Sequence, residues 1–243
     1  MVTLRVAVLA AGTTVASVAA KAASSSISMV FAGVGGDPVK LGLVNSLNRP
    51  GGNMTGIAML TIDLGGKRLE LLNELAPRAT TVAFLVNPNN PNAEVTLQQT
   101  PEAARRLGKS LEVAKAANDA ELEPAFAMVV QKGAGALMVD ADPFFYSQRT
   151  RAVALAEHYR LPAIYEFRDF VASGGLMSYA PDATDLYRQA GVYTARVLKG
   201  ELPAELPVMQ PVKFQFAINL KTAKSLGVTL PPTLIARADE VIE

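Results

Sequence analysis

The sequence predicts an α/β fold built on parallel β-sheets, and two observations predict it. Short runs of Val, Ile, Leu and Ala recur along the chain between turn residues, and segments with helical periodicity separate them. The runs are nearly continuous in apolar residues, which is typical of strands in a parallel sheet whose two faces are both covered. Alternation of such strands with helices predicts right-handed βαβ units.

The expected strands are short and end at polar or turn residues. In chain order they are Arg5–Ala11, Ile27–Ala32, Thr81–Val86, Leu111–Ala116, Ala136–Val139, Pro162–Tyr165 and Gly175–Ser178.

The expected helices have clear ends. Lys67–Leu75 places its leucines on one face and stops before Pro77, and Glu102–Leu107 is followed by Gly108, a typical C-terminal signal. Two further helices are expected at Ser147–Arg160, which ends before Pro162, and at Leu186–Leu198.

The N-terminal segment has two interpretations. A short basic start, an apolar stretch and small residues around Ala20-Lys21-Ala22 are how a secretory signal looks. The same residues also form a strand at Arg5–Ala11, a turn, and an Ala-rich helix at Val15–Ala23 capped by Thr13 or Thr14. The two threonines interrupt what would be the apolar core of a signal, so we favour the strand and helix.

Composition excludes several classes of function. The chain has 243 residues, 50% of them hydrophobic, and 23 basic against 22 acidic side chains. This balance predicts a folded protein with no nucleic-acid partner. With no Cys and a single His, thiol chemistry and Cys or multi-His metal sites are excluded, and we expect neither metal nor cofactor. No segment reaches transmembrane length.

Irregular, Gly- and Pro-rich stretches predict passages between two lobes. They are Arg49–Gly66, Ser173–Pro181 and Gly200–Pro211. Three such passages would give a protein of two lobes joined by three crossovers.

Polar residues follow the predicted strands, and in open parallel sheets ligands bind at the carboxyl ends of the strands. Thr13 and Thr14 begin a helix, where free N–H groups favour a carboxylate, although they could also be plain caps. The carboxylates of Asp37, Asp140 and Asp142 could bind a ligand ammonium, although Asp near Pro is also common in turns. The other strand-end candidates are Asn87 and the aromatic residues Phe144, Tyr165 and Phe167, each aromatic ring being also a candidate for the core or its rim.

Enzyme motifs are mostly missing. Gly33-Val34-Gly35-Gly36-Asp37 lacks the third glycine of a dinucleotide fingerprint, and Lys40 is not in a phosphate-loop context. His158 is predicted inside a helix, on its surface, and there is no Gly-x-Ser-x-Gly elbow for a hydrolase. Asp140 and Asp142, on alternate residues, leave a hydrolytic carboxylate pair open as an alternative.

Four stretches of the chain resemble one protein family. They are SMVFAGVGGDPVKLGLVNSLNRPGGN, GKRLELLNELAP, LPAIYEFRDFVASGGLMSYA and FAINLKTAKSLGVTLPPTLIARADEVIE. In order and spacing they resemble the substrate-binding proteins of ABC importers of the tryptophan/tyrosine uptake type, and the similarity runs essentially from end to end.

The resemblance implies a type I periplasmic-binding-protein fold of two Rossmann-like lobes that close over a small ligand in the cleft. The lobes would be 1–60 with 177–205, and 61–176 with 206–243. It implies a periplasmic, non-catalytic receptor that captures an amino acid or related organic acid and delivers it to a membrane permease, and we expect a monomer. Family motifs fall on Gly12-Thr13-Thr14, Asp37-Pro38-Val39, Asn87-Pro88, Asp140–Pro143 and Tyr165–Phe167.

The chain departs from the family pattern at its start. Relatives begin with an export signal and two further βα units before the segment that resembles Arg5–Ser25, so the first lobe is expected to be incomplete and the chain truncated. The resemblance also favours the strand-and-helix interpretation of this segment.

The expected roles are a carboxylate contact for Thr13 and Thr14, an ammonium contact for Asp37 and for Asp140 or Asp142, and a side-chain contact for the three aromatic residues. Three alternatives remain open: a ligand-binding sensor or regulatory domain on the same fold, a small α/β hydrolase, and a gene fragment that cannot fold alone.

Overall fold

A computed structural model describes residues 6–243, and within it the chain divides into two compact units. Unit 1 comprises Met1–Thr61 and Pro181–Phe214, and unit 2 comprises Ile62–Ala180 and Gln215–Glu243, so the chain passes between them three times. Two boundaries differ from the sequence-based ranges. Met177–Pro181 is a strand that pairs in the unit 2 sheet, so the second passage comes at its end, between Ala180 and Pro181, rather than at 177. The 206–214 segment stays with unit 1, because Met209 pairs with its sheet.

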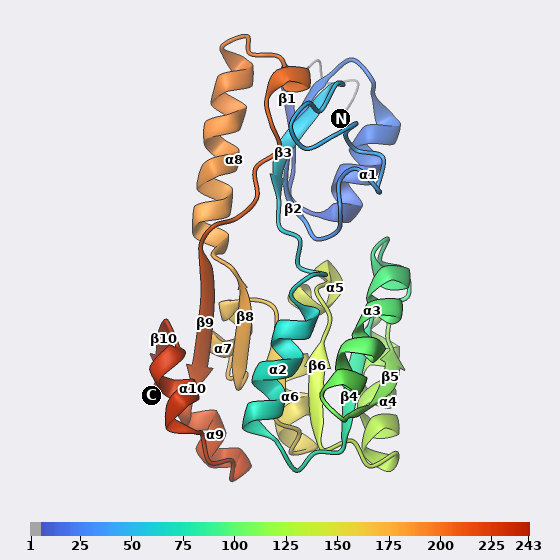
Figure 1. The fold of residues 1–243 in the computed structure, drawn as a ribbon. Coiled ribbons are helices and arrows are strands. Elements are labelled where there is room, and N and C mark those ends of the chain that lie inside the picture. The colour runs from blue at the N-terminus through green and yellow to red at the C-terminus, as the bar shows by residue number, and fades with distance from the viewer. Residues whose placement is uncertain (1–5) are drawn as a thin grey trace. The chain divides into compact units, whose positions relative to one another are not determined.

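Unit 1 contains a three-stranded parallel sheet in the order β1-β2-β3 (Figure 1). The strands are β1 (Val8–Ala11), β2 (Ser28–Val34) and β3 (Met54–Ala58). Helices α1 (Thr14–Ala23) and α8 (Ala183–Leu198) lie on opposite sides of this sheet. The strand-and-helix interpretation of the N-terminal segment is therefore confirmed from Val8 onward, with the start of the expected strand, Arg5, outside the described residues.

Helix α1 begins where the sequence predicts. Thr13 is extended and its hydroxyl accepts a hydrogen bond from Ala16 N at 3.1 Å, so Thr13 rather than Thr14 is the N-cap. Burial of Ala20 against Met29 and Phe31 then holds the helix on the sheet.

Strand β3 was not expected, because its sequence lies in the Gly-rich stretch taken as a passage. Gly56 permits it: an added Cβ would lie 2.0 Å from the main-chain oxygen of Phe31 on the neighbouring strand. Only glycine allows β3 to approach β2 this closely.

Unit 2 contains a seven-stranded sheet in the order β10-β9-β8-β7-β6-β4-β5, and its recorded pairings are parallel. The strands are β4 (Thr81–Val86), β5 (Ser110–Lys115), β6 (Ala136–Val139), β7 (Ala163–Tyr165), β8 (Met177–Pro181), β9 (Phe214–Asn219) and β10 (Glu240–Ile242). The helices are α2 (Gly65–Leu75), α3 (Ala93–Arg106), α4 (Asp119–Gln131), α5 (Pro143–Ser147), α6 (Arg149–His158), α7 (Arg168–Ala172), α9 (Leu220–Leu226) and α10 (Pro232–Arg237), and a short 3-10 helix, η2 (Pro203–Glu205), lies in unit 1.

Both faces of the unit 2 sheet are covered, as its continuous apolar strands predict. On one face Phe84, Met138 and Ile164 pack with residues of α2, α3, α9 and α10. On the other, Val139 and Tyr165 pack with residues of α4, α5, α6 and α7. The α/β class with parallel sheets is thus confirmed, and strands β4, β5, β6 and β7 contribute alternate residues to the two cores.

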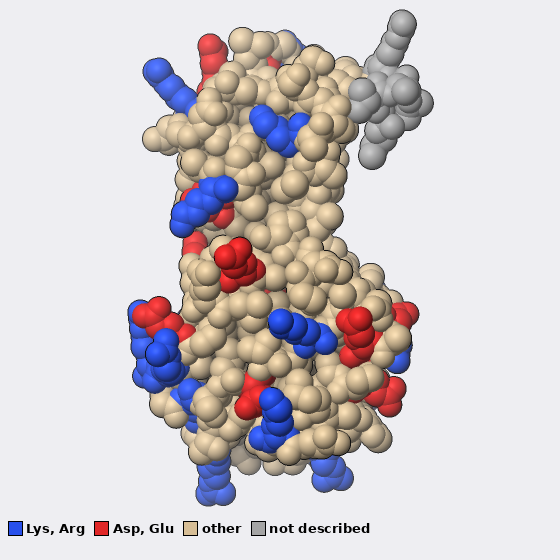
Figure 2. Space-filling model, turned by 90° about the vertical axis from the view of Figure 1, so that its right-hand side faces the viewer, with Lys and Arg blue, Asp and Glu red and all other residues tan. Residues whose placement is uncertain are grey.

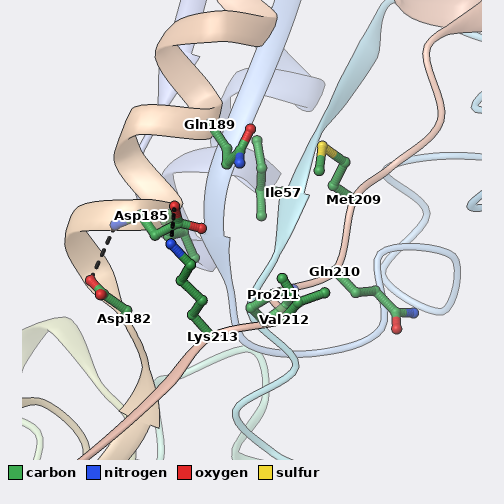
Figure 3. Close-up of a pocket in the computed structure, with 10 residues that line it drawn as sticks. Ile57, Asp182, Asp185, Gln189, Met209, Gln210, Pro211, Val212 and Lys213 are labelled. Carbon is green, nitrogen blue, oxygen red and sulfur yellow. Dashed lines mark hydrogen bonds and ion pairs between the residues drawn. The ribbon is translucent and has the colours of Figure 1, made fainter.

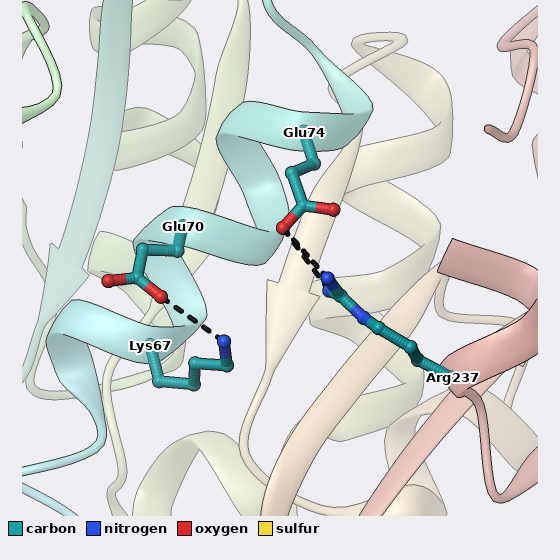
Figure 4. A network of polar contacts seen from close by, with 4 residues as sticks. All are labelled: Lys67, Glu70, Glu74 and Arg237. Atoms are coloured by element: carbon teal, nitrogen blue, oxygen red, sulfur yellow. Dashed lines mark hydrogen bonds and ion pairs between the residues drawn. The ribbon is translucent and has the colours of Figure 1, made fainter. Parts of the chain in front are cut away.

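Surface ion pairs of unit 2 form both between helices and within one helix. Arg237 of α10 donates from both terminal nitrogens to one oxygen of Glu74 on α2, at 3.2 Å each, and Lys67 pairs with Glu70 on the same helix (Figure 4). On the face shown in Figure 2, acidic and basic side chains are interspersed.

Candidate functional site

The carboxyl ends of β4, β6 and β7 gather buried polar side chains in unit 2. Asn87 follows β4, Asp140 follows β6 and Glu166 follows β7, and all three are at most 9% exposed. Parallel pairing of these strands brings their ends to one edge of the sheet, as the sequence predicts for Asn87 and Asp140.

Asp142 is fully engaged within the unit. One oxygen accepts hydrogen bonds from Phe144 N at 2.8 Å and from Asn87 Nδ2 at 3.1 Å, and the other accepts from Asn90 Nδ2 at 2.7 Å. The carboxylate is therefore the N-cap of α5 and the anchor of the loop after β4. The role of Asp142 within the unit is therefore the local structural one that the sequence offered as the alternative to an ammonium contact.

Asp140 occupies the α2 face of the sheet. Its oxygens accept from Thr96 Oγ1 of α3 at 3.0 Å and from the N–H of Ala141 at 2.9 Å. Burial raises the pKa of Asp140 to about 6, and the guanidinium of Arg68 acts in the opposite direction.

Glu166 and Arg68 complete this cluster, and neither was among the expected site residues. Arg68 is 2% exposed on α2, and its charge reaches both Asp140 and Glu166. Burial raises the pKa of Glu166 to about 8, partly countered by Arg68. The sequence held one signal for Glu166, its position directly after a predicted strand. For Arg68 there was none, because it lies in a helix flanked by exposed Lys67 and Glu70.

The three aromatic candidates have different surroundings. Tyr165 is 1% exposed and stacks on Phe170 with 4.7 Å between ring centroids, so it lies in the core. Phe144 and Phe167 are partly buried, and the edge of Tyr146 meets Phe167 at 5.7 Å. Phe144 lies in α5, after β6, and Phe167 directly precedes α7, after β7; both rings pack partly exposed against the core on the α4–α7 face.

In unit 1 the candidates also follow strand ends. Besides the cap made by Thr13, Thr14 Oγ1 accepts from Gly35 N at 3.0 Å, which ties the β1 and β2 loops together. Asp37 is partly buried and accepts from the N–H of Val39 at 2.8 Å, the geometry of an Asx turn. His158, expected on a helix surface, is the exposed last residue of α6.

Two hollows contain none of the expected residues. In unit 1, the N-terminal part of α8 and the segment 209–213 enclose about 20 Å³, room for about one water (Figure 3). Asp185 lies at its wall, paired with Lys213 at 3.7 Å. In unit 2, a more open polar hollow of about 220 Å³ lies over the start of α2 and the middle of α3, at Gly65, Gly66 and Thr100.

Two other kinds of feature are absent from residues 6–243. No helix in this range combines the length and apolar character needed to cross a membrane. The same residues contain no grouping of three or more His, Cys, Asp or Glu side chains suited to a metal ion.

Known proteins resemble the chain along its whole length. The profile of the family described as ABC transporter substrate binding protein matches residues 1–242. A tyrosine-binding protein of Clostridioides difficile (strain R20291) is 28% identical over 193 residues, covering 79% of this chain and 55% of that protein. The chain thus spans about half the length of this curated relative.

Two solved structures have the same fold over 99% of this chain and 80% of theirs. They are an ABC domain of Streptococcus pneumonia in complex with L-Trp, with a TM-score of 0.89 and 25% identity, and a conserved domain protein of Vibrio cholerae, with 0.90 and 26%. The type I periplasmic-binding-protein fold is confirmed. From its family profile, and in agreement with the sequence motifs, the chain belongs to the ABC transporter substrate-binding protein family, whose members bind ligands without catalysis.

Proposed function

We propose that this chain is the solute-binding component of an ABC importer and that its ligand is an amino acid, with aromatic amino acids the first to test. Membership of the family carries the proposal. The tyrosine-binding relative and the L-Trp complex support the choice of ligand class. Like other extracellular members of the family, it would act in the periplasm or at the outer cell surface, hand its ligand to a membrane permease, and leave the ligand chemically unchanged.

Each unit offers chemistry suited to an amino acid. In unit 1, the N-terminus of α1 at Thr13 and Thr14 would favour a carboxylate, because the helix dipole attracts an anion there. Asp37 would contribute through the loop it shapes rather than by direct contact, since its carboxylate already caps a turn.

In unit 2, the acidic cluster at the ends of β6 and β7, which includes Asp140, suits an ammonium group. Phe144 and Phe167 are the rings available to an aromatic side chain. Asn87 and Asp142 would hold this loop in place, because their polar atoms are used by one another and by the backbone. Tyr165 would support Phe167 from the core.

Thermal unfolding of the purified chain with L-tryptophan and L-tyrosine tests the proposal. A ligand that binds only the folded state raises the melting temperature as the ligand concentration increases. At a ligand concentration 100 times the dissociation constant, the folded state is stabilised by about 2.7 kcal/mol. We expect L-tryptophan or L-tyrosine to raise it and D-glucose to leave it unchanged. A cooperative melt that no amino acid shifts would refute the proposed ligand class. A shift caused by sugars alone would refute it in favour of a sugar ligand.

A further inference from the structure

Glu166 is a buried carboxyl without a hydrogen-bond donor. It is 7% exposed, and no group among residues 6–243 donates a hydrogen bond to it. The other two carboxylates of the cluster differ, since Asp140 accepts from Thr96 and a backbone N–H, and Asp142 from two asparagine amides and a backbone N–H. Because no group among the described residues occupies this acceptor, it is open to an external donor.

The strand register places Glu166 beside Asp140. In the parallel pair β6 and β7, Met138 lies opposite Ile164, and the same register continued by two residues sets Asp140 next to Glu166. Met138 and Ile164 both contribute to the core under α2, so side chains two residues further point to the same face. Arg68 of α2 lies on that face, and its charge acts on both carboxyls.

The charges of this cluster do not balance among its own residues. The guanidinium of Arg68 acts on the carboxyls of Asp140 and Glu166, and the carboxylate of Asp142 adds a further negative charge near both. Burying an uncompensated carboxylate is costly, so the cluster keeps a proton instead, and burial raises the pKa of Glu166 to about 8. A second cation held beside Glu166 would supply the positive charge that this proton supplies in the unliganded chain.

We propose that Glu166 receives the ammonium group of the ligand and gives up its proton to solvent when the ligand binds. The inference rests on the proposed function and deepens it, because it assigns the ammonium contact to a residue with a free acceptor and makes binding proton-linked. The step is a single proton transfer: the carboxylic acid O–H breaks, a water molecule takes the proton and passes it to the buffer, and the carboxylate pairs with the ammonium.

Other charged and titratable groups surround Glu166. They are Arg68 on α2, Asp140 after β6, Asp142 before α5, Tyr179 beside it in the register of β8, and Arg168 on α7, whose guanidinium is bound to Glu240. Asp140 has a pKa of about 6 and is mostly ionised above pH 7, so titration between pH 7 and 8.5 isolates Glu166.

Calorimetric titration with L-tryptophan and L-tyrosine, at several pH values and in buffers of different ionisation enthalpy, tests the inference. We expect binding to release about 0.9 proton at pH 7 and about a quarter of a proton at pH 8.5, and the affinity to rise about eightfold between them, as one linked group requires. The deaminated analogue indole-3-propionate should bind without this dependence. Glu166→Gln should lose at least tenfold in affinity for the amino acid at pH 8 and show a flat profile, whereas Glu166→Asp should keep a pH-dependent profile.

Glu70→Gln, on the exposed surface of α2, is the matched control and should behave as the wild type. Amino-acid binding with pH-independent affinity and no proton release would overturn the assignment of Glu166 while leaving the proposed function intact. Proton release that persists in Glu166→Gln would overturn it in favour of Asp140. Failure of both amino acids to bind at any pH would overturn the inference and the proposed ligand class together.

Discussion

Replacing Glu166 by Gln should remove much of the pH dependence of the stability of unit 2. In the folded chain the pKa of this carboxyl is raised from 4.5 to about 8 by burial. Between these values the folded state keeps a proton that the unfolded state has released, so stability falls as pH rises through this window and the loss is complete above about pH 8.

The magnitude follows from the two pKa values. At about 1.4 kcal/mol per pH unit, the full difference corresponds to roughly 5 kcal/mol, and relaxation with water entry around a buried charge reduces it to an expected 2–4 kcal/mol. Gln resembles the protonated acid in shape and charge. Glu166→Gln should therefore match the wild type near pH 5 and exceed its stability by that amount at pH 9.

Urea unfolding at pH 5, 7 and 9 measures this difference, and hydrogen exchange of the β6 and β7 amides reports unit 2 separately from unit 1. Glu70→Gln, whose carboxylate is 52% exposed beside Lys67, should follow the wild type throughout. Parallel curves for wild type and Glu166→Gln from pH 5 to 9 would refute the account of Glu166 as a carboxyl kept neutral by burial.

The remaining predictions concern backbone and surface contacts. Gly56→Ala should destabilise unit 1 by more than about 3 kcal/mol in urea unfolding, since the new Cβ would lie 2.0 Å from a main-chain oxygen of β2. The control Gly42→Ala, with open space around the new Cβ, should cost about 1 kcal/mol. Equal losses in the two variants would contradict this account of Gly56. Asp142→Ala should cost about 2–3 kcal/mol because the start of α5 and two buried amides lose their acceptor, and a loss below about 0.5 kcal/mol would exclude that role. Arg237→Ala should change stability by less than about 1 kcal/mol, because its pair with Glu74 is exposed; a larger, salt-dependent loss would show that this pair holds α10 in place.

Local patterns were sufficient to predict the elements that carry strong local signals. Strands β4 and β6 have the bounds expected from their apolar runs, and α1 begins at a threonine cap. Helix α3 was expected only over its last turns, because Pro101 obscures its first part. The helix expected at 147–160 is α6, and the short helix α5 that precedes it was not expected.

Strand-end position alone found part of the candidate site. It identified Asn87, Asp140 and Asp142, but it could not rank them, because the hydrogen bonds that occupy Asp142 come from a loop more than fifty residues away. Tyr165 was expected to contact the ligand because it also lies at the end of a strand. Its side chain instead points into the core, where it stacks on Phe170, and that direction depends on the register of β7.

The sequence by itself determined the alternation of strands and helices, the parallel sheets and the polar character of their carboxyl ends, because these depend on residue type and short spacing. Only the tertiary structure decided that β3 joins the unit 1 sheet, that Arg68 is buried, and that Glu166 lies beside Asp140 without a donor. These features depend on register and burial between segments far apart in the chain, and the cost of burying charge is set by that packing rather than by the residues themselves.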